Sequence, residues 1–303
     1  MRVRAVCPSG WFALAALTVA SSLSGRALAQ DQPAVPSVLV LDTSEKNGAL
    51  NLGGDNMLTV RKGNLVVNSS DNLALFSANS TVAVQNGTIQ IVGGYSDLGQ
   101  ASTTPVPQTG MQPVADPLAK RVQYPEDAKA RERQKLIIPD SHHTVLEPGY
   151  YLGGISALGQ NVQLTLNPGV YVIWDGDFFI SAAELDGQGV TIVMAGQNPG
   201  RLIFGDGSHV RLQAPAEGPL KDILVVSKGV AQGNRSDIGF SAADCVLRGT
   251  IYAPRGRVGI FAKSRVRAGY VVCFNLMMNT GAELEVLGVP ASDAAWEKIG
   301  AEQ

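Results

Sequence analysis

The stretch LEPGYYLGGI, residues 146–155, is followed by LNPGVYVIWD, residues 166–175. Both segments carry Leu, any residue, Pro, Gly, any residue and Tyr in that order, and they begin 20 residues apart. Repeats of this length are typical of structural units that bury their apolar face only by stacking on a neighbour. The repeat therefore predicts stacked units, and its Pro-Gly pair predicts a turn at the same place in each unit.

Other segments join a turn to the start of an alternating strand, with a most frequent step near 20 residues. They are NSTV 79–82, GQNV 159–162, GQGV 187–190, GSHV 207–210, ADCV 243–246, KSRV 263–266 and GAEL 281–284. After each one, apolar and polar residues alternate, as in strands with one buried face. A coil of about 20 residues, at about 3.3 Å per residue, wraps once around a narrow apolar core. We therefore expect an all-β fold, a single-stranded right-handed parallel β-helix or solenoid.

Composition divides the chain into five parts. Residues 1–29 read as a signal peptide, with Arg2 and Arg4 ahead of an apolar segment and Ala27-Leu28-Ala29 as the cleavage pattern. Residues 30–95 and 141–290 carry the coil texture. Between them, residues 96–140 are Pro-rich and then charged, which predicts an excursion of loop and short helix. Residues 291–303 predict a tail or a short helix that caps the final coil.

Charge and length limit the partners of the mature chain. Removal of Arg2, Arg4 and Arg26 with the signal peptide leaves 21 basic against 26 acidic residues, a net charge of −5. This balance disfavours nucleic acid, which is bound through clustered Lys and Arg. No later segment is apolar for long enough to span a membrane. Two cysteines remain, Cys245 and Cys273, and we expect two buried thiols more than a disulfide because they fall at different places around the coil.

Several strings occur in an order that resembles a known family. GGYS 93–96, PVADPLA 113–119, the two opening segments and GTIYAP 249–254 are similar to the Gly-rich β-helical region of TadE/TadG-like pilus-assembly and related exported bacterial proteins. The resemblance covers about residues 50 to 290. It implies a right-handed β-helix on an exported protein, and a pilus-associated role in some relatives. Those relatives usually begin with a retained membrane helix, whereas this chain begins with a cleavable signal, so the resemblance supports fold and export first.

Four acids are candidates for polysaccharide chemistry, because parallel β-helices also host lyases and glycoside hydrolases. Asp175 and Asp177 lie two residues apart beside Trp174, whose ring is suited to stacking on a sugar. Asp186 and Asp206 are 20 residues apart, so they are expected to stack on adjacent coils about 4.8 Å apart. Glycosidases need two carboxyl groups about 5 to 9.5 Å apart. Asp186 and Asp206 both precede Gly, and Asp-Gly is an ordinary turn signal, which favours a role in turn formation.

The basic segment KSRVRAG is the other candidate binding surface. It places Lys263, Arg265 and Arg267 on one outward face, which suits either an acidic glycan or simple solvation. The three histidines, His142, His143 and His209, have no metal-ligand spacing, so no metal site is predicted. Calcium stays open because β-helix enzymes leave only scattered acids as its trace. No other cofactor is predicted.

The sequence favours a non-enzymatic protein exported to the periplasm, the cell surface or the medium. Its expected role is a structural or adhesive component of the envelope or a pilus, with polysaccharide or other envelope proteins as partners. Two alternatives stay open. A polysaccharide lyase or glycoside hydrolase predicts that Trp174 and the four acids converge in one groove, whereas a carbohydrate-binding or self-polymerising module predicts aromatic residues without an acid pair, or an uncapped terminal coil.

Overall fold

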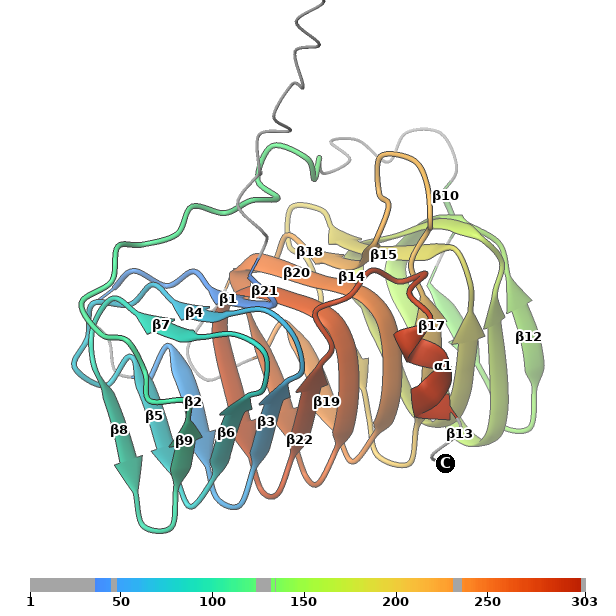
Figure 1. The fold of residues 1–303 in the computed structure, drawn as a ribbon. Helices are drawn as coiled ribbons and strands as arrows, with labels where there is room; N and C mark the ends of the chain where they lie inside the picture. Colours follow the sequence, from blue (N-terminus) through green and yellow to red (C-terminus); the bar gives the residue numbers. More distant parts are fainter. Residues whose placement is uncertain (1–35, 45–47, 124–131, 134, 231–235, 301–303) are drawn as a thin grey trace, which may run out of the picture. The chain divides into compact units, whose positions relative to one another are not determined.

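The computed structural model describes residues 36–44, 48–123, 132–133, 135–230 and 236–300. The predicted signal peptide therefore lies outside the described residues. Within them, strands run parallel to their partners and wind into a β-solenoid with three flat faces, which confirms the predicted parallel β-helix (Figure 1). We call the faces A, B and C in the order in which each coil passes through them.

The strands of each face follow one another along the stack. Face A contains β10 (Glu132–Arg133), the first parts of β13 (Gly149–Leu166) and β14 (Gly169–Gly187), β15 (Val190–Ala195), β18 (Ile223–Ser227), the middles of β20 (Asp244–Phe261) and β21 (Arg265–Asn279), β1 (Val38–Val40), β4 (Leu65–Val67) and β7 (Ile89–Ile91). Face B contains β11 (Leu136–Ile138), the middles of β13 and β14, β16 (Leu202–Phe204), β19 (Ile238–Ser241), the ends of β20 and β21, β2 (Leu50–Gly53), β5 (Leu75–Ala78) and β8 (Tyr95–Leu98). Face C contains β12 (His143–Leu146), the ends of β13 and β14, β17 (His209–Gln213), the starts of β20 and β21, β22 (Glu283–Val286), β3 (Met57–Val60), β6 (Thr81–Val84) and β9 (Ser102–Thr104).

The opening repeat is the corner between face C and face A, as its Pro-Gly pair predicted. Leu146 and Leu166 end face C in two successive coils and are paired with each other. Past the Pro-Gly turn, the rings of Tyr151 and Tyr171 stack in the core with centroids 6.1 Å apart. Each Tyr hydroxyl donates to the carbonyl four residues earlier, at 2.6 Å for Tyr151 and 2.8 Å for Tyr171. The motif thus closes a corner and satisfies the buried hydroxyl in one step.

Alternating side chains fill the space between the faces. Val162, Leu164 and Leu166 are buried, and the residues between them face outward, as predicted. Two predicted anchors are wrong. Val190 begins a face A strand, so Ala183 takes its place in the face C ladder. Val246 points outward, and Cys245 fills the inward position. The repeat step misled at Val190 because this residue also follows a Gly turn and begins a strand, although that strand, β15, is buried at every position. At Val246 it misled by one residue.

The order of coils in space differs from their order in the chain. The first coil, β1–β3, pairs on one side with β4–β6 and on the other with β21 and β22 near the end of the sequence (Figure 1). Val38 is paired with Val271 and Leu58 with Leu284. We call this non-covalent junction the seam. The stack therefore runs from β7–β9 at one end, through the seam, to β10–β12 at the other.

The predicted excursion is shorter than residues 96–140. β8 and β9 extend the solenoid to Thr104, while β10 and β11 begin the opposite end. Of the residues predicted as a short helix, Glu132–Arg133 and Leu136 are strand, and residues 125–131 and 134 lie outside the described residues. Residues 105–123, which we call the strap, leave the β8–β9 end and run across the strands of face A (Figure 1). The strap packs Val114, Leu118 and Val122 onto the outward side of that face.

Helix α1 (Ala295–Gly300) confirms the predicted C-terminal helix but does not cap an end of the stack. The last coil in the sequence lies at the seam, so its edge is already covered by β1–β3. Instead, α1 lies against face C, where the buried Trp296 packs with Leu287, Val289 and Val246. Arg248 lies over the Trp296 ring and pairs with Glu297 at 3.0 Å.

Candidate functional site

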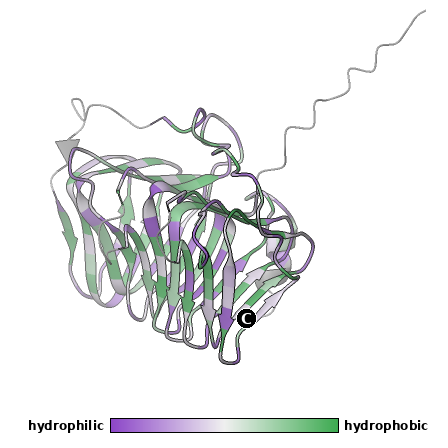
Figure 2. Cartoon of the chain, turned by 90° about the vertical axis from the view of Figure 1, so that its left-hand side faces the viewer, coloured by the Kyte–Doolittle hydropathy of each residue, from purple (hydrophilic) through white to green (hydrophobic). Residues whose placement is uncertain are grey.

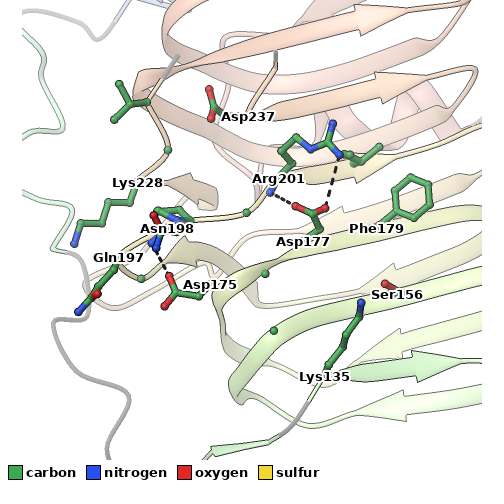
Figure 3. A pocket seen from close by; sticks show the side chains of 18 of the residues that line it. Lys135, Ser156, Asp175, Asp177, Phe179, Gln197, Asn198, Arg201, Lys228 and Asp237 are labelled. Carbon is green, nitrogen blue, oxygen red and sulfur yellow. Dashed lines mark hydrogen bonds and ion pairs between the residues drawn. The ribbon is translucent and has the colours of Figure 1, made fainter. Parts of the chain in front are cut away.

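A cleft of about 780 Å³ lies along the corner between faces A and B (Figure 3). It crosses several coils, because the same corner of each contributes lining residues. Four cationic side chains line it: Lys135, Arg201, Lys228 and Arg255. Asp175, Asp177 and Asp237 line it as well, together with the amides of Gln197 and Asn198 and the ring of Phe179. We call it the corner cleft.

The acids of the corner cleft bind backbone of the next coil. Asp175 Oδ1 accepts a hydrogen bond from the Asn198 N–H at 2.7 Å, and Asp177 Oδ1 accepts one from the Arg201 N–H at 2.7 Å (Figure 3). Asp237 Oδ2 accepts one from the Arg257 N–H at 2.9 Å. Each carboxylate therefore satisfies a donor that an irregular corner leaves outside the strand ladder. The predicted role in turn formation accounts for these contacts.

Glycine is required at this corner by close backbone approach. A Cβ on Gly176 would lie 2.1 Å from the carbonyl carbon of Gly153, and one on Gly200 would lie 2.0 Å from the Gly176 oxygen. Neither backbone position can shift without breaking the stacking of the coils. Five glycines, Gly153, Gly176, Gly196, Gly200 and Gly229, line the corner cleft together with its side chains.

Asp186 and Asp206 do not stack on each other, contrary to the sequence expectation. Asp186 faces outward on face C and is paired with Arg211 of β17. It lines a second cleft of about 380 Å³ beside Trp296 of α1. Asp206 lies in the turn before β17, where its carbonyl accepts the Ala182 N–H at 2.8 Å. Residues 196–200 lengthen the coil that begins with β15. The residue paired with Asp186 is therefore Arg211, 25 positions later, and not Asp206, 20 positions later.

Trp174 also lies apart from these acids. It is half-buried and packs against the apolar cluster between face A and the strap. The corner cleft does not include it among its lining residues. The residues of the predicted enzyme groove therefore do not converge in the described structure. Asp175 and Asp177 share the corner cleft, and Asp186 lines the second cleft. Asp206 lies in a turn, and Trp174 packs in the apolar cluster under the strap.

The predicted basic surface is balanced by acids of the next strand. Arg265 lies 3.7 Å from Glu283, and Arg267 lies 3.3 Å from Glu285. Glu285 also pairs with Arg61 across the seam. Lys263 occupies the preceding turn with a positive φ of 61°. The alternation of charge along face C places opposite charges in neighbouring rungs, which is the favourable arrangement for cross-strand pairs.

The histidines and cysteines lie where surface and core residues are expected. His142, His143 and His209 are exposed. No group of three or more His, Cys, Asp or Glu side chains suited to a metal ion occurs among the residues that the structure describes. Cys245 and Cys273 are free and buried, which confirms two thiols rather than a disulfide. Burial raises the pKa of the Cys273 thiol, and burial and the Asp244 carboxylate raise the pKa of Cys245, so neither is an activated nucleophile.

Face B carries a surface that the sequence reasoning missed. One outward residue from each of its strands forms a continuous ladder of paired positions: Ile137, Ser156, Phe179, Ile203, Gly239, Gly259, Met277, Asn51, Phe76 and Ser96. The ladder contains no charged residue. The alternation of strands such as LIF, residues 202–204, shows which residue faces outward, but the order of the coils is needed to see that these residues adjoin.

Comparisons with known proteins add no relative: no family model, no curated protein and no solved structure matches the chain. In the described part of the chain, no helix has the length and apolar character needed to cross a membrane.

Proposed function

We propose that the protein is an exported, non-enzymatic β-solenoid that acts as a structural or adhesive component of the cell envelope or surface, with face B as its adhesive surface. The observation that carries this proposal is the uncharged outward ladder on face B. Face A is covered by the strap, and face C carries charges and α1. Among the described residues, face B carries outward ladders without charge that no described segment covers. A rigid repetitive surface of this kind suits contact with another extended surface.

The contacts of the acids support the non-enzymatic part of the proposal. Asp175, Asp177 and Asp237 each accept a backbone N–H of the next coil. One oxygen of each carboxylate thus joins two coils, which gives these acids a structural role. The resemblance to exported pilus-assembly proteins supports the export and envelope part, and a pilus-associated role is included in the proposal. The final location is the periplasm, the cell surface or the medium.

Fractionation and sedimentation test the proposal together. Producing cells are separated into cytoplasm, periplasm, envelope and medium, and the mature protein is then sedimented with isolated envelopes. We expect export and co-sedimentation, with loss of the latter in Ile203→Lys on face B. Arg211→Ser on face C is the matched control and should sediment like the parent. Retention in the cytoplasm, or equal sedimentation of the two variants, would contradict the proposal.

A second candidate function is polysaccharide cleavage at the corner cleft. The observation in its favour is that Asp175 and Asp177 share a cleft of about 780 Å³ with four cationic side chains. The mature protein is incubated with acidic and neutral polysaccharides, with and without calcium, and new reducing ends or unsaturated products are measured. Cleavage that disappears in Asp175→Asn and Asp177→Asn would favour the enzyme over the adhesive protein. Asp186→Asn, outside this cleft, is the control.

A further inference from the structure

Face B presents two adjacent outward ladders without charge. The second lies two residues along each strand from the first and contains Leu158, Ser181, Gly205, Ser241, Phe261, Asn279, Gly53, Ala78 and Leu98. Aspartate, glutamate, lysine and arginine are absent from both ladders. On face C the equivalent outward positions include Glu184, Arg211, Arg265 and Glu283. Figure 2 shows the hydropathy of the strands and turns around the stack.

The dimensions of this surface distinguish a polymer from a globular partner. Ten paired strands at about 4.8 Å give a length of about 45 Å, and two outward ladders give a width of about 10 Å. The resulting area is about 450 Å², compared with about 800 Å² on each partner in a standard protein complex. A second copy of the chain, docked on this strip alone, would bury too little area for a stable dimer. A single extended chain laid along the solenoid axis matches the strip in length and in width.

The chemistry of the two ladders matches a sugar polymer. Phe179, Phe261 and Phe76 are spaced at intervals of three strands, about 14 Å at 4.8 Å per strand. Phenyl rings offer flat apolar faces for the C–H groups of pyranose rings. Ser and Asn side chains between the rings offer donors and acceptors for hydroxyl groups. Neither ladder contains a cation, and the cations nearest the strip line the corner cleft at its edge, so a polymer that follows both ladders is expected to be neutral.

Gly239 lies in the middle of the strip and, although its backbone is buried, leaves room for a side chain. A Cβ added there meets no atom within 4 Å, whereas one added to Gly259 would lie 2.5 Å from the Phe261 ring. The Phe261 ring therefore lies over Gly259, one strand from Gly239. A side chain introduced at Gly239 would stand on the surface without displacing the core.

From this geometry we infer that face B binds a neutral polysaccharide chain along the solenoid axis. The inference rests on the proposed adhesive function of face B and names its ligand class. The strip adjoins the corner cleft, because Ser156, Phe179 and Ile203 of the first ladder also line that cleft, whose four cations lie outside both ladders.

Co-sedimentation tests the inference with named probes. The mature protein is mixed with microcrystalline cellulose or chitin as neutral polysaccharides, and with insoluble cross-linked polygalacturonate as an acidic one. We expect binding to at least one neutral polysaccharide and none to the acidic one. Gly239→Arg should weaken binding about tenfold or more, equivalent to at least about 1.4 kcal/mol. Thr81→Arg on face C is the matched control and should bind like the parent.

Two further measurements keep the outcome decisive. Thermal unfolding shows whether Gly239→Arg is folded, and Phe179→Ser serves as a second variant if it is not. Soluble oligosaccharides from the bound polymer should bind more tightly with each added sugar until they span the strip. Failure to bind either neutral polysaccharide, or equal binding by Gly239→Arg and Thr81→Arg, overturns the inference. If envelopes still sediment the parent but not Ile203→Lys, the adhesive proposal stands without it.

Discussion

Faces A and B carry similar apolar outward residues, but only face A is covered by its own chain. On face A, Val193 and Val272 are 4% and 0% exposed beneath the strap. On face B, Phe179 and Ile203 are half-buried with no segment laid over them in the described structure. An outward apolar ladder is therefore not by itself a sign of function. Face B differs because the strap, which could cover an apolar face, packs on face A and leaves face B uncovered in the described structure.

The largest effect is expected where the cover is tight. Val193→Lys places a charge between face A and the strap, within the apolar cluster that contains Leu118 and Val122. Burial of an unpaired charge predicts a loss of about 3–5 kcal/mol in the free energy of unfolding. Urea unfolding followed by circular dichroism measures it. A loss below about 1 kcal/mol would show that the strap is readily displaced, and that faces A and B do not differ as argued.

A smaller effect is expected at the clamp between the strap and the solenoid. Asn68 donates to the Val114 carbonyl at 2.8 Å and accepts from the Val114 N–H at 2.9 Å. Asn68→Ala removes both bonds and leaves two backbone groups without their partner, which predicts a loss of about 1–3 kcal/mol. Proteolysis within residues 105–123 should become faster in this variant. Tyr252→Phe, which removes the 2.7 Å bond to the Asp116 side chain and leaves the two Val114 backbone bonds in place, should lose less.

Face C supplies a third comparison, because it is exposed like face B but charged. Arg267→Glu places a carboxylate beside Glu285 in the next strand and removes the 3.3 Å ion pair. We expect a loss of about 1 kcal/mol at low salt, which shrinks as salt screens the repulsion. Unfolding at two salt concentrations measures this. If the loss is independent of salt, packing of the arginine stem rather than charge is responsible.

The smallest effect is expected on the uncovered face. Ile203→Lys lies on β16, which follows β15 and its Val193, so the two lysine variants probe the same coil. Because the outward side of β16 is exposed to solvent, the new side chain remains hydrated, and the stability change should be within about 0.5 kcal/mol. Urea unfolding alongside Val193→Lys provides the comparison. A loss as large as that of Val193→Lys would mean that face B is covered.

Local patterns of the sequence predict the coil but not the order of the coils. The Pro-Gly corner and the alternation around Val162 depend on neighbouring residues, and the structure confirms both. The pairing of Val38 with Val271 leaves no local trace, so the seam could not be predicted. The candidate site divides in the same way. Asp175 and Asp177 share a cleft because they are neighbours in the chain. Asp186 and Asp206 would be paired only if the coil between them had 20 residues, and the longer coil pairs Asp186 with Arg211 instead.

The seam also determines the route by which the chain folds. Asn275 donates to the Asp42 carboxylate at 2.8 Å across a separation of 233 residues, and its strand neighbours repeat such distant contacts. High contact order slows folding, because the entropy of closing a long loop is lost before the contact forms. Until β21 and β22 are in place, β1–β3 offer unpaired strand edges to any other chain. We therefore expect the two outer parts to form first and the seam last, so that the intermediate most exposed to aggregation is a nearly complete solenoid with an open seam.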